Sequence, residues 1–257
     1  MGDKKVTNNE KTKKGKSKKG IIITIIIVLV ILAVSVIGYF AYIGNQVELL
    51  DTEINKAIET LENIADENGT INKDAQIDME IKTAGKFAII EETYKNYINE
   101  MAELSKQADD IFDEESFENI LSEENIKNDG PEFIQSKAKI SEAKTKTEEY
   151  FDKVIEICSK EKMLTLLDDK EISNFYKETY KEAIEDAIKS ENLEKTIEDL
   201  KKSKTQVSKA YEYLNKIITF LSDNKSSWTF EDGQITFNSQ TKLNQYNELV
   251  KEVPEID

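Results

Sequence analysis

Residues 193–221 read LEKTIEDLKKSKTQVSKAYEYLNKIITFL and carry the clearest periodic pattern in the chain. Apolar side chains recur there at alternating steps of four and three, and only Lys204 interrupts the series. This spacing places them on one face of a helix and is typical of a coiled coil or a helical hairpin. The pattern is compatible with an antiparallel bundle within one chain and with a parallel dimer. Its apolar positions are Leu193, Ile197, Leu200, Val207, Tyr211, Leu214, Ile218 and Leu221.

Similar stripes of apolar residues occupy the chain on both sides of this segment. Steps of three and four run through residues 47–64, 77–111, 150–158 and 172–187. The 257 residues include only 9 glycines and 2 prolines, the two residue types that most often interrupt helices. The sequence therefore predicts an all-α fold, in which residues 44–257 form an elongated, coiled-coil-like helical bundle.

One short segment, WTFEDGQITF at residues 228–237, departs from the helical pattern. Asp-Gly is a favoured two-residue turn between antiparallel strands, so we expect a small C-terminal β-hairpin. A two-residue turn pairs Phe230 with Ile235 and Trp228 with Phe237 on one face. This aromatic face is the candidate contact site for a partner, but the pattern favours a packing role in which the same face closes one end of the bundle. A final amphipathic helix is predicted at about residues 240–252.

The amino-terminal part of the chain contains a long apolar block. Between Gly20 and Val47 there is no charged side chain, and residues 21–43 are hydrophobic enough and long enough to cross a bilayer core of about 30 Å. The block exceeds the usual apolar core of a signal peptide, and no small-residue cleavage pattern follows it. We therefore expect a permanent transmembrane helix at residues 21–43.

The charges around this block predict its orientation. Eight lysines and only two acidic residues precede it in residues 1–20, while the whole chain has a net charge of −16. Basic flanks remain on the cytoplasmic side, so the expected protein is a single-pass protein of the cell membrane with a cytoplasmic tail and an acidic extracytoplasmic domain at residues 44–257. The lysine cluster is also expected to contact anionic lipid of the inner leaflet.

The composition excludes several classes of function. The chain has no histidine, which removes Ser-His-Asp and Cys-His catalysis and histidine-bound zinc. Five S-x-x-K matches occur in a lysine-rich chain without the KTG motif that accompanies them in penicillin-binding enzymes. An EF-hand alignment places Ile64 and Ala75 at the two end positions, where calcium ligands are required. We therefore predict no catalytic, cofactor-binding or metal-binding residues.

These observations favour a non-enzymatic interaction or scaffold protein of the cell envelope. The alternative is a sensory or regulatory domain that binds a small ligand and signals through a membrane partner. Membrane lipid, a protein partner and a second copy of the chain are the expected contacts. Nucleic acid is not expected, because an acidic surface lacks the clustered cations that phosphates require. Cys158 is the only cysteine and is predicted to be a buried thiol without an intrachain disulfide.

Overall fold

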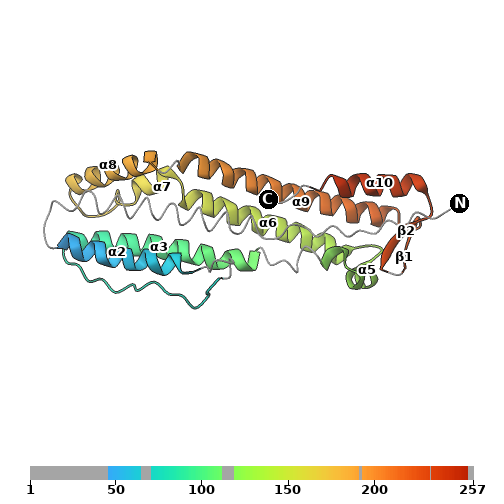
Figure 1. Ribbon diagram of the computed structural model, residues 1–257, viewed down its shortest axis with the longest axis horizontal. Coiled ribbons are helices and arrows are strands. Elements are labelled where there is room, and N and C mark those ends of the chain that lie inside the picture. The colour runs from blue at the N-terminus through green and yellow to red at the C-terminus, as the bar shows by residue number, and fades with distance from the viewer. Residues whose placement is uncertain (1–45, 65–70, 112–118, 191–192, 232, 254–257) are drawn as a thin grey trace. The chain divides into compact units, whose positions relative to one another are not determined.

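The computed structural model describes residues 46–64, 71–111, 119–190, 193–231 and 233–253. The basic tail at 1–20 and the predicted membrane helix at 21–43 lie outside this range. Among the helices that are described, none has both the length and the hydropathy needed to cross a bilayer. The described chain is mostly helical and ends in one small hairpin followed by a helix, which confirms the predicted fold class at that level (Figure 1).

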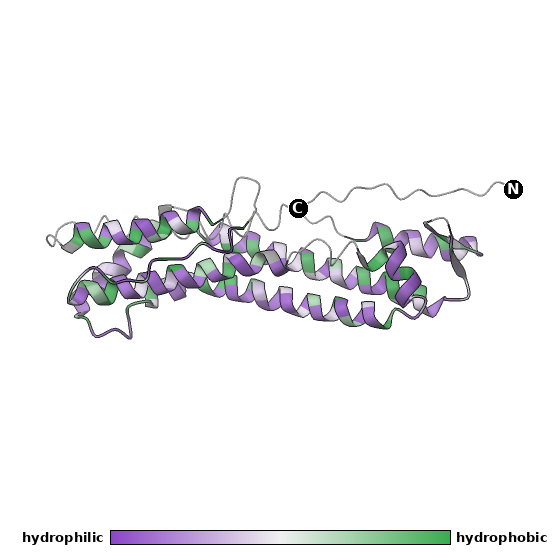
Figure 2. Ribbon diagram, turned by 90° about the horizontal axis from the view of Figure 1, so that it is seen from below, coloured by the Kyte–Doolittle hydropathy of each residue, from purple (hydrophilic) through white to green (hydrophobic). Residues whose placement is uncertain are grey.

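Hydrophilic and hydrophobic residues are interspersed along the helices, as expected of amphipathic helices (Figure 2). The elements are α2 (Gln46–Glu62), α3 (Lys86–Ile111), η1 (Asn119–Leu121), α5 (Glu123–Asp129), α6 (Ile134–Ile157), α7 (Lys160–Thr165), α8 (Asn174–Ser190), α9 (Leu193–Asp223), β1 (Trp228–Glu231), β2 (Gln234–Phe237) and α10 (Gln240–Lys251).

The chain divides into two compact units. In the described residues, unit 1 comprises 119–148 and 203–253, and unit 2 comprises 46–111 and 149–202. The division falls within α6 and within α9, so each unit contains one part of both helices. Each unit has its own set of buried apolar side chains.

In unit 2, α2 and α3 run parallel to each other. Glu53 of α2 contacts Lys95 of α3, with 3.2 Å between the carboxylate and the ammonium. Further along, the backbone N–H of Asn72 donates to the carbonyl of Ile64 just after α2, and Lys73 pairs with Asp110 near the end of α3. Both helices therefore begin at the same end of the unit, and the non-helical segment 71–85 returns the chain to that end.

Tyrosine hydroxyls join the other helices of unit 2. Tyr97 of α3 donates to the carbonyl of Ile157, and Tyr150 of α6 donates to the carbonyl of Leu104 at 3.1 Å. The two bonds are two helical turns apart on each helix, so α3 and this part of α6 are antiparallel. Tyr180 of α8 donates in the same way to the carbonyl of Met163 in α7.

The prediction of one helical stripe over 77–111 was wrong at its beginning. Residues 77–84 are not helical, and α3 starts only at Lys86. Two features account for this. Gly85 has a φ of +61°, which interrupts a right-handed helix, and the Glu91 carboxylate accepts the backbone N–H groups of Lys82 and Thr83.

In unit 1, residues 203–221 of the apolar stripe pack against another helix of the same chain. Residues 134–148 of α6 and 203–223 of α9 are antiparallel, as shown by contacts that pair Lys144 with Glu212 and Thr147 with Tyr211. At the other end of this pair, Ser222 donates to the carbonyl of Glu132. Val207, Tyr211, Leu214, Ile218 and Leu221 are buried, as the heptad pattern requires. Of the two alternatives left by the sequence, unit 1 contains the antiparallel one.

The hairpin has the predicted register. Trp228 lies opposite Phe237, Thr229 opposite Thr236 and Phe230 opposite Ile235 in an antiparallel pair. Gly233 has a φ of +74°, in the left-handed region that a tight hairpin turn uses. The final helix, α10, follows from Gln240 to Lys251, close to the predicted bounds.

Candidate functional site

The four predicted contact residues lie on one face of the hairpin in unit 1, and that face turns toward helices of the same unit. The Trp228 ring stacks on Phe133 at a centroid distance of 6.2 Å, and its indole N–H donates to the carbonyl of Leu221 at 2.8 Å. Phe237 lies 6.1 Å from the ring of Phe220 and 5.3 Å from that of Tyr246. Two of the four residues therefore support the packing of α9 and α10.

The hairpin face is nevertheless not fully covered. Trp228, Phe230, Ile235 and Phe237 are all half-buried, whereas Thr229 and Thr236 on the opposite face are exposed. No residue of α10 is buried either. The hairpin and α10 form a layer whose apolar side chains keep part of their surface accessible, and the contact role of the four residues stays a prediction.

Unit 2 contains a buried cluster of three charged side chains that the sequence pattern does not predict. Lys95, Glu91 and Glu53 have side chains that are 1%, 0% and 4% exposed. The Lys95 ammonium lies 2.8 Å from Glu91 and 3.2 Å from Glu53, and it also donates to the backbone carbonyl of Glu80 at 2.7 Å. One lysine therefore connects α2, α3 and the segment before α3.

The Glu91 carboxylate is surrounded by donors. It accepts the backbone N–H of Lys82 at 3.1 Å, the backbone N–H of Thr83 at 2.8 Å and the Thr83 hydroxyl at 2.7 Å. Together with Lys95, these donors satisfy both of its oxygens. A buried charge that is fully partnered in this way holds a structure in one arrangement, whereas removal of one partner leaves an uncompensated charge.

The partners of each group set the direction of its pKa. Burial alone would raise the pKa of Glu91, but the hydrogen bonds from Lys95 and Thr83 outweigh it, so the pKa is lowered. The hydrogen bond from exposed Lys56, aided by Lys95, lowers the pKa of Glu53 against the effect of burial. Burial would lower the pKa of Lys95, but the two carboxylates raise it. All three groups are therefore held in their charged forms.

These shifts predict acid sensitivity of unit 2. A lowered carboxyl pKa stabilises the fold above its ordinary value of 4.5, and this stabilisation is lost as the pH falls through the lower folded value. Glu91→Gln should therefore lower the urea midpoint at pH 7, and its difference from the unchanged chain should shrink as the pH falls below 4.5, because the Glu91 carboxylate of the unchanged chain is then progressively protonated.

Circular dichroism during urea unfolding measures this difference. The matched control is Glu142→Gln, which removes an exposed pair with Lys146 and should change little at any pH. A Glu91→Gln effect of constant size from pH 7 to about pH 3 would contradict the assignment. At alkaline pH, the raised pKa of Lys95 means that its contribution to the stability of the fold is fully present below the ordinary value of 10.5. This contribution is lost as the pH rises above that value.

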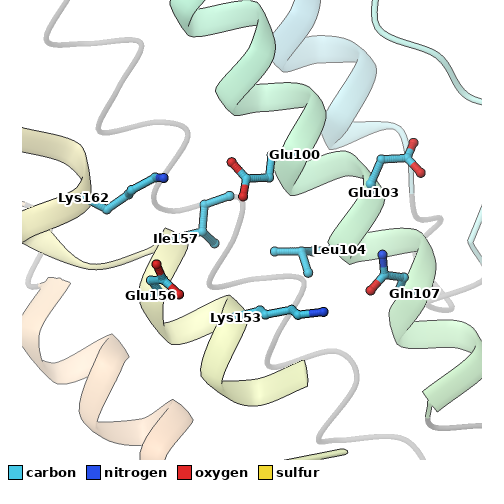
Figure 3. A pocket seen from close by; sticks show the side chains of 8 residues that line it. All are labelled: Glu100, Glu103, Leu104, Gln107, Lys153, Glu156, Ile157 and Lys162. Atoms are coloured by element: carbon cyan, nitrogen blue, oxygen red, sulfur yellow. The ribbon is translucent and has the colours of Figure 1, made fainter. Parts of the chain in front are cut away.

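A cavity of about 280 Å³ opens in unit 2 between α3, α6 and α7. Figure 3 shows carboxylates and ammonium groups around it, together with the apolar side chains of Leu104 and Ile157. The backbone carbonyls of these two residues are the ones that accept the Tyr150 and Tyr97 hydroxyls, so the cavity sits over a rigid junction of α3 and α6. The charged and polar residues lining it are Glu100, Glu103, Gln107, Lys153, Glu156 and Lys162.

Cys158 lies at the end of α6 and is completely buried, as the sequence predicted. Burial raises the pKa of its thiol to about 12. A thiol that is both inaccessible and protonated reacts slowly with oxidants and alkylating reagents. Cys158 is therefore a packing residue of unit 2.

The chain matches no family model, no curated protein and no solved structure.

Proposed function

We propose that this protein is a single-pass protein of the cell membrane whose helical region at 44–257 lies outside the cytoplasm. The support comes from residues 21–43, which contain no charged side chain and follow eight lysines. The whole chain has a net charge of −16 although residues 1–20 are basic, so the excess of acidic residues lies after this block. There the acidic residues do not oppose the orientation that the lysines predict.

We further propose that the external region is a non-enzymatic interaction or scaffold component of the cell envelope. The observation that supports this proposal is that the buried charged groups bind within the fold. Lys95, Glu91 and Glu53 contact one another and the nearby backbone, and these contacts fix the geometry of unit 2. One group of accessible apolar side chains, by contrast, consists of half-buried residues of the hairpin and α10. Such a layer, on a fixed framework, suits contact with another protein or a second copy of the chain.

Thiol labelling in intact cells tests the topology. Because Cys158 is buried, the unchanged chain should react with an impermeant maleimide only after unfolding. Thr229→Cys, on the exposed face of the hairpin, should be labelled without cell disruption. The matched control is Ser17→Cys in the basic tail, which should be labelled only after the membrane is permeabilised. Protection of the Thr229→Cys variant until lysis would contradict the proposed orientation.

Site-directed crosslinking tests the interaction role. A photoreactive residue at Phe230 should capture specific envelope proteins or a second copy of the chain, whereas the same group at exposed Thr229 on the opposite face should capture them less. Equal yields from both faces, or no product from Phe230, would count against the hairpin face as the contact surface.

A second candidate function is that of a sensory domain, and the cavity between α3, α6 and α7 favours it. Its lining combines carboxylates and ammonium groups, which suits a small zwitterion that carries both charges. Such a ligand should raise the thermal midpoint of the unchanged chain and have no effect on a Lys162→Ala variant. Free amino acids and short peptides are the compounds to screen, and equal shifts in both chains would remove the cavity as the site.

A further inference from the structure

Three helices of unit 2 begin at the same end of that unit. The contacts between α2 and α3 place Gln46 and Lys86 at one end, because Glu53 meets Lys95 there and residues near Ile64 meet Asp110 at the other end. Two aromatic contacts, Phe87 with Tyr176 and Tyr94 with Tyr180, show that α8 runs in the same direction. Figure 1 shows α2, α3 and α8 starting together on the left.

This end of unit 2 carries a group of aromatic side chains and a lysine, which we call the aromatic end patch: Lys86, Phe87, Phe175 and Tyr176. Phe175 is 60% exposed and lies edge-on to Tyr176 at 5.6 Å. Phe87 is half-buried and meets the same ring at 6.0 Å, and the Lys86 ammonium lies 4.8 Å from the centre of that ring. An isolated exposed phenylalanine is common on protein surfaces, so exposure alone does not indicate a contact surface. The position of the patch relative to the proposed membrane span is the deciding observation.

The proposed membrane span ends close to this patch. The apolar block ends at Ile43 and α2 begins at Gln46, so only three residue steps separate them. Three steps of a fully extended chain cover at most about 11 Å. Whatever conformation residues 44 and 45 adopt, the end of unit 2 that contains Gln46 must stay near the bilayer surface. Neighbouring helices pack about 8 to 10 Å apart, and α3 and α8 begin at the same end of unit 2 as α2. Lys86 on α3 and Phe175 on α8 therefore also lie near the bilayer surface.

We propose that the aromatic end patch contacts the headgroup layer of the membrane in which the chain is anchored. This inference rests on the proposed span at 21–43. Aromatic rings favour the interface between water and hydrocarbon, where an exposed phenylalanine buries apolar surface. The Lys86 ammonium, which lies over the Tyr176 ring, can meanwhile attract a lipid phosphate.

The contact has a consequence for how the external region stands on the membrane. A connection of two residues alone would leave unit 2 free to pivot about the end of its span. A second contact through Phe175 and Lys86, which belong to α8 and α3, restricts that pivoting. The Glu53, Glu91 and Lys95 cluster fixes α2 against α3, so the span and the patch would then act on one rigid body.

Fluorescence quenching by brominated lipid tests the proposal with the full-length chain in liposomes. Phe175→Trp places a reporter in the patch and keeps an exposed aromatic side chain. Gln107→Trp is the control, because Gln107 is exposed and lies about 30 Å further along α3 than Lys86. The unchanged chain, whose only tryptophan is Trp228, supplies the background emission.

Lipid that is brominated close to its headgroup should quench the added emission of Phe175→Trp by roughly half or more. The added emission of Gln107→Trp should stay nearly unchanged, because only the tryptophan at position 175 reaches the interface. Liposome flotation after alkaline extraction tests the membrane span separately from the patch contact. A chain that floats without selective quenching of Phe175→Trp would overturn the patch contact alone. A chain that does not float would overturn the span and, with it, the contact.

Discussion

Replacing Lys95 with methionine should lower the free energy of unfolding by about 3 to 5 kcal/mol, because it leaves two buried carboxylates without their shared cation. Methionine has nearly the same length as the lysine stem, so the loss comes from the charge and its hydrogen bonds and not from an empty space. Glu53 and Glu91 are 4% and 0% exposed, and water cannot take over the role of the ammonium without opening the contact between α2 and α3.

Urea unfolding of the full-length chain in detergent, followed by circular dichroism, measures this change. Lys146→Met is the matched control, since Lys146 and Glu142 form a pair of the same i,i+4 type at the surface, with side chains 62% and 65% exposed. That control should shift the free energy of unfolding by no more than about 0.5 kcal/mol. Similar losses for Lys95→Met and Lys146→Met would mean that the buried cluster is not a stabilising feature of the fold.

Replacing Phe133 with alanine should cost about 3 to 5 kcal/mol and should disturb the hairpin more than the rest of unit 1. The Phe133 side chain is completely buried and stacks on Trp228, so its removal leaves a cavity under the aromatic face. Phe133 has a φ of +53°, which is unfavourable for alanine as well as for phenylalanine, so the backbone term is about the same in both chains. The measured loss therefore reports the ring.

Two signals follow the Phe133→Ala change. Urea unfolding gives the free energy, and the emission of Trp228, the only tryptophan, should move to longer wavelength as water reaches the indole. Ile134→Ala is a neighbouring control, because Ile134 is 71% exposed and should change the stability by at most about 0.5 kcal/mol. An unchanged Trp228 emission in Phe133→Ala would show that the hairpin does not depend on this ring.

The hairpin face has the packing role that the sequence favours for it. Trp228 and Phe237 contact helices α9 and α10 and the Phe133 ring. The Phe230 and Ile235 pair keeps part of its surface accessible. Any partner contact at this face therefore adds to an existing packing role, and it is best tested at Phe230, where substitution disturbs fewer internal contacts than at Trp228.

Features that depend on residues close together in the chain follow from its local patterns. The steps of three and four predicted the long helices, apart from the non-helical start of the 77–111 stripe, and the Asp-Gly turn with alternating apolar residues predicted the hairpin register of Trp228 with Phe237. Both patterns are local, since the period of a helix or a strand decides which side chains share a face. The heptad of α9 similarly predicted which residues would be buried, with the exception of half-buried Ile197, but not the element that covers them.

The pairing of distant segments and the burial of charges depend on how the whole chain packs. Glu91 and Lys95 have the spacing of an ordinary surface pair on a helix, and nothing in that spacing distinguishes them from Glu142 and Lys146. Their burial results from α2 and the segment before α3, which lie up to 42 residues away in the chain. The same carboxylate draws the backbone of Thr83 out of the helical pattern. Such pairings depend on packing between distant segments, which local periodicity does not encode.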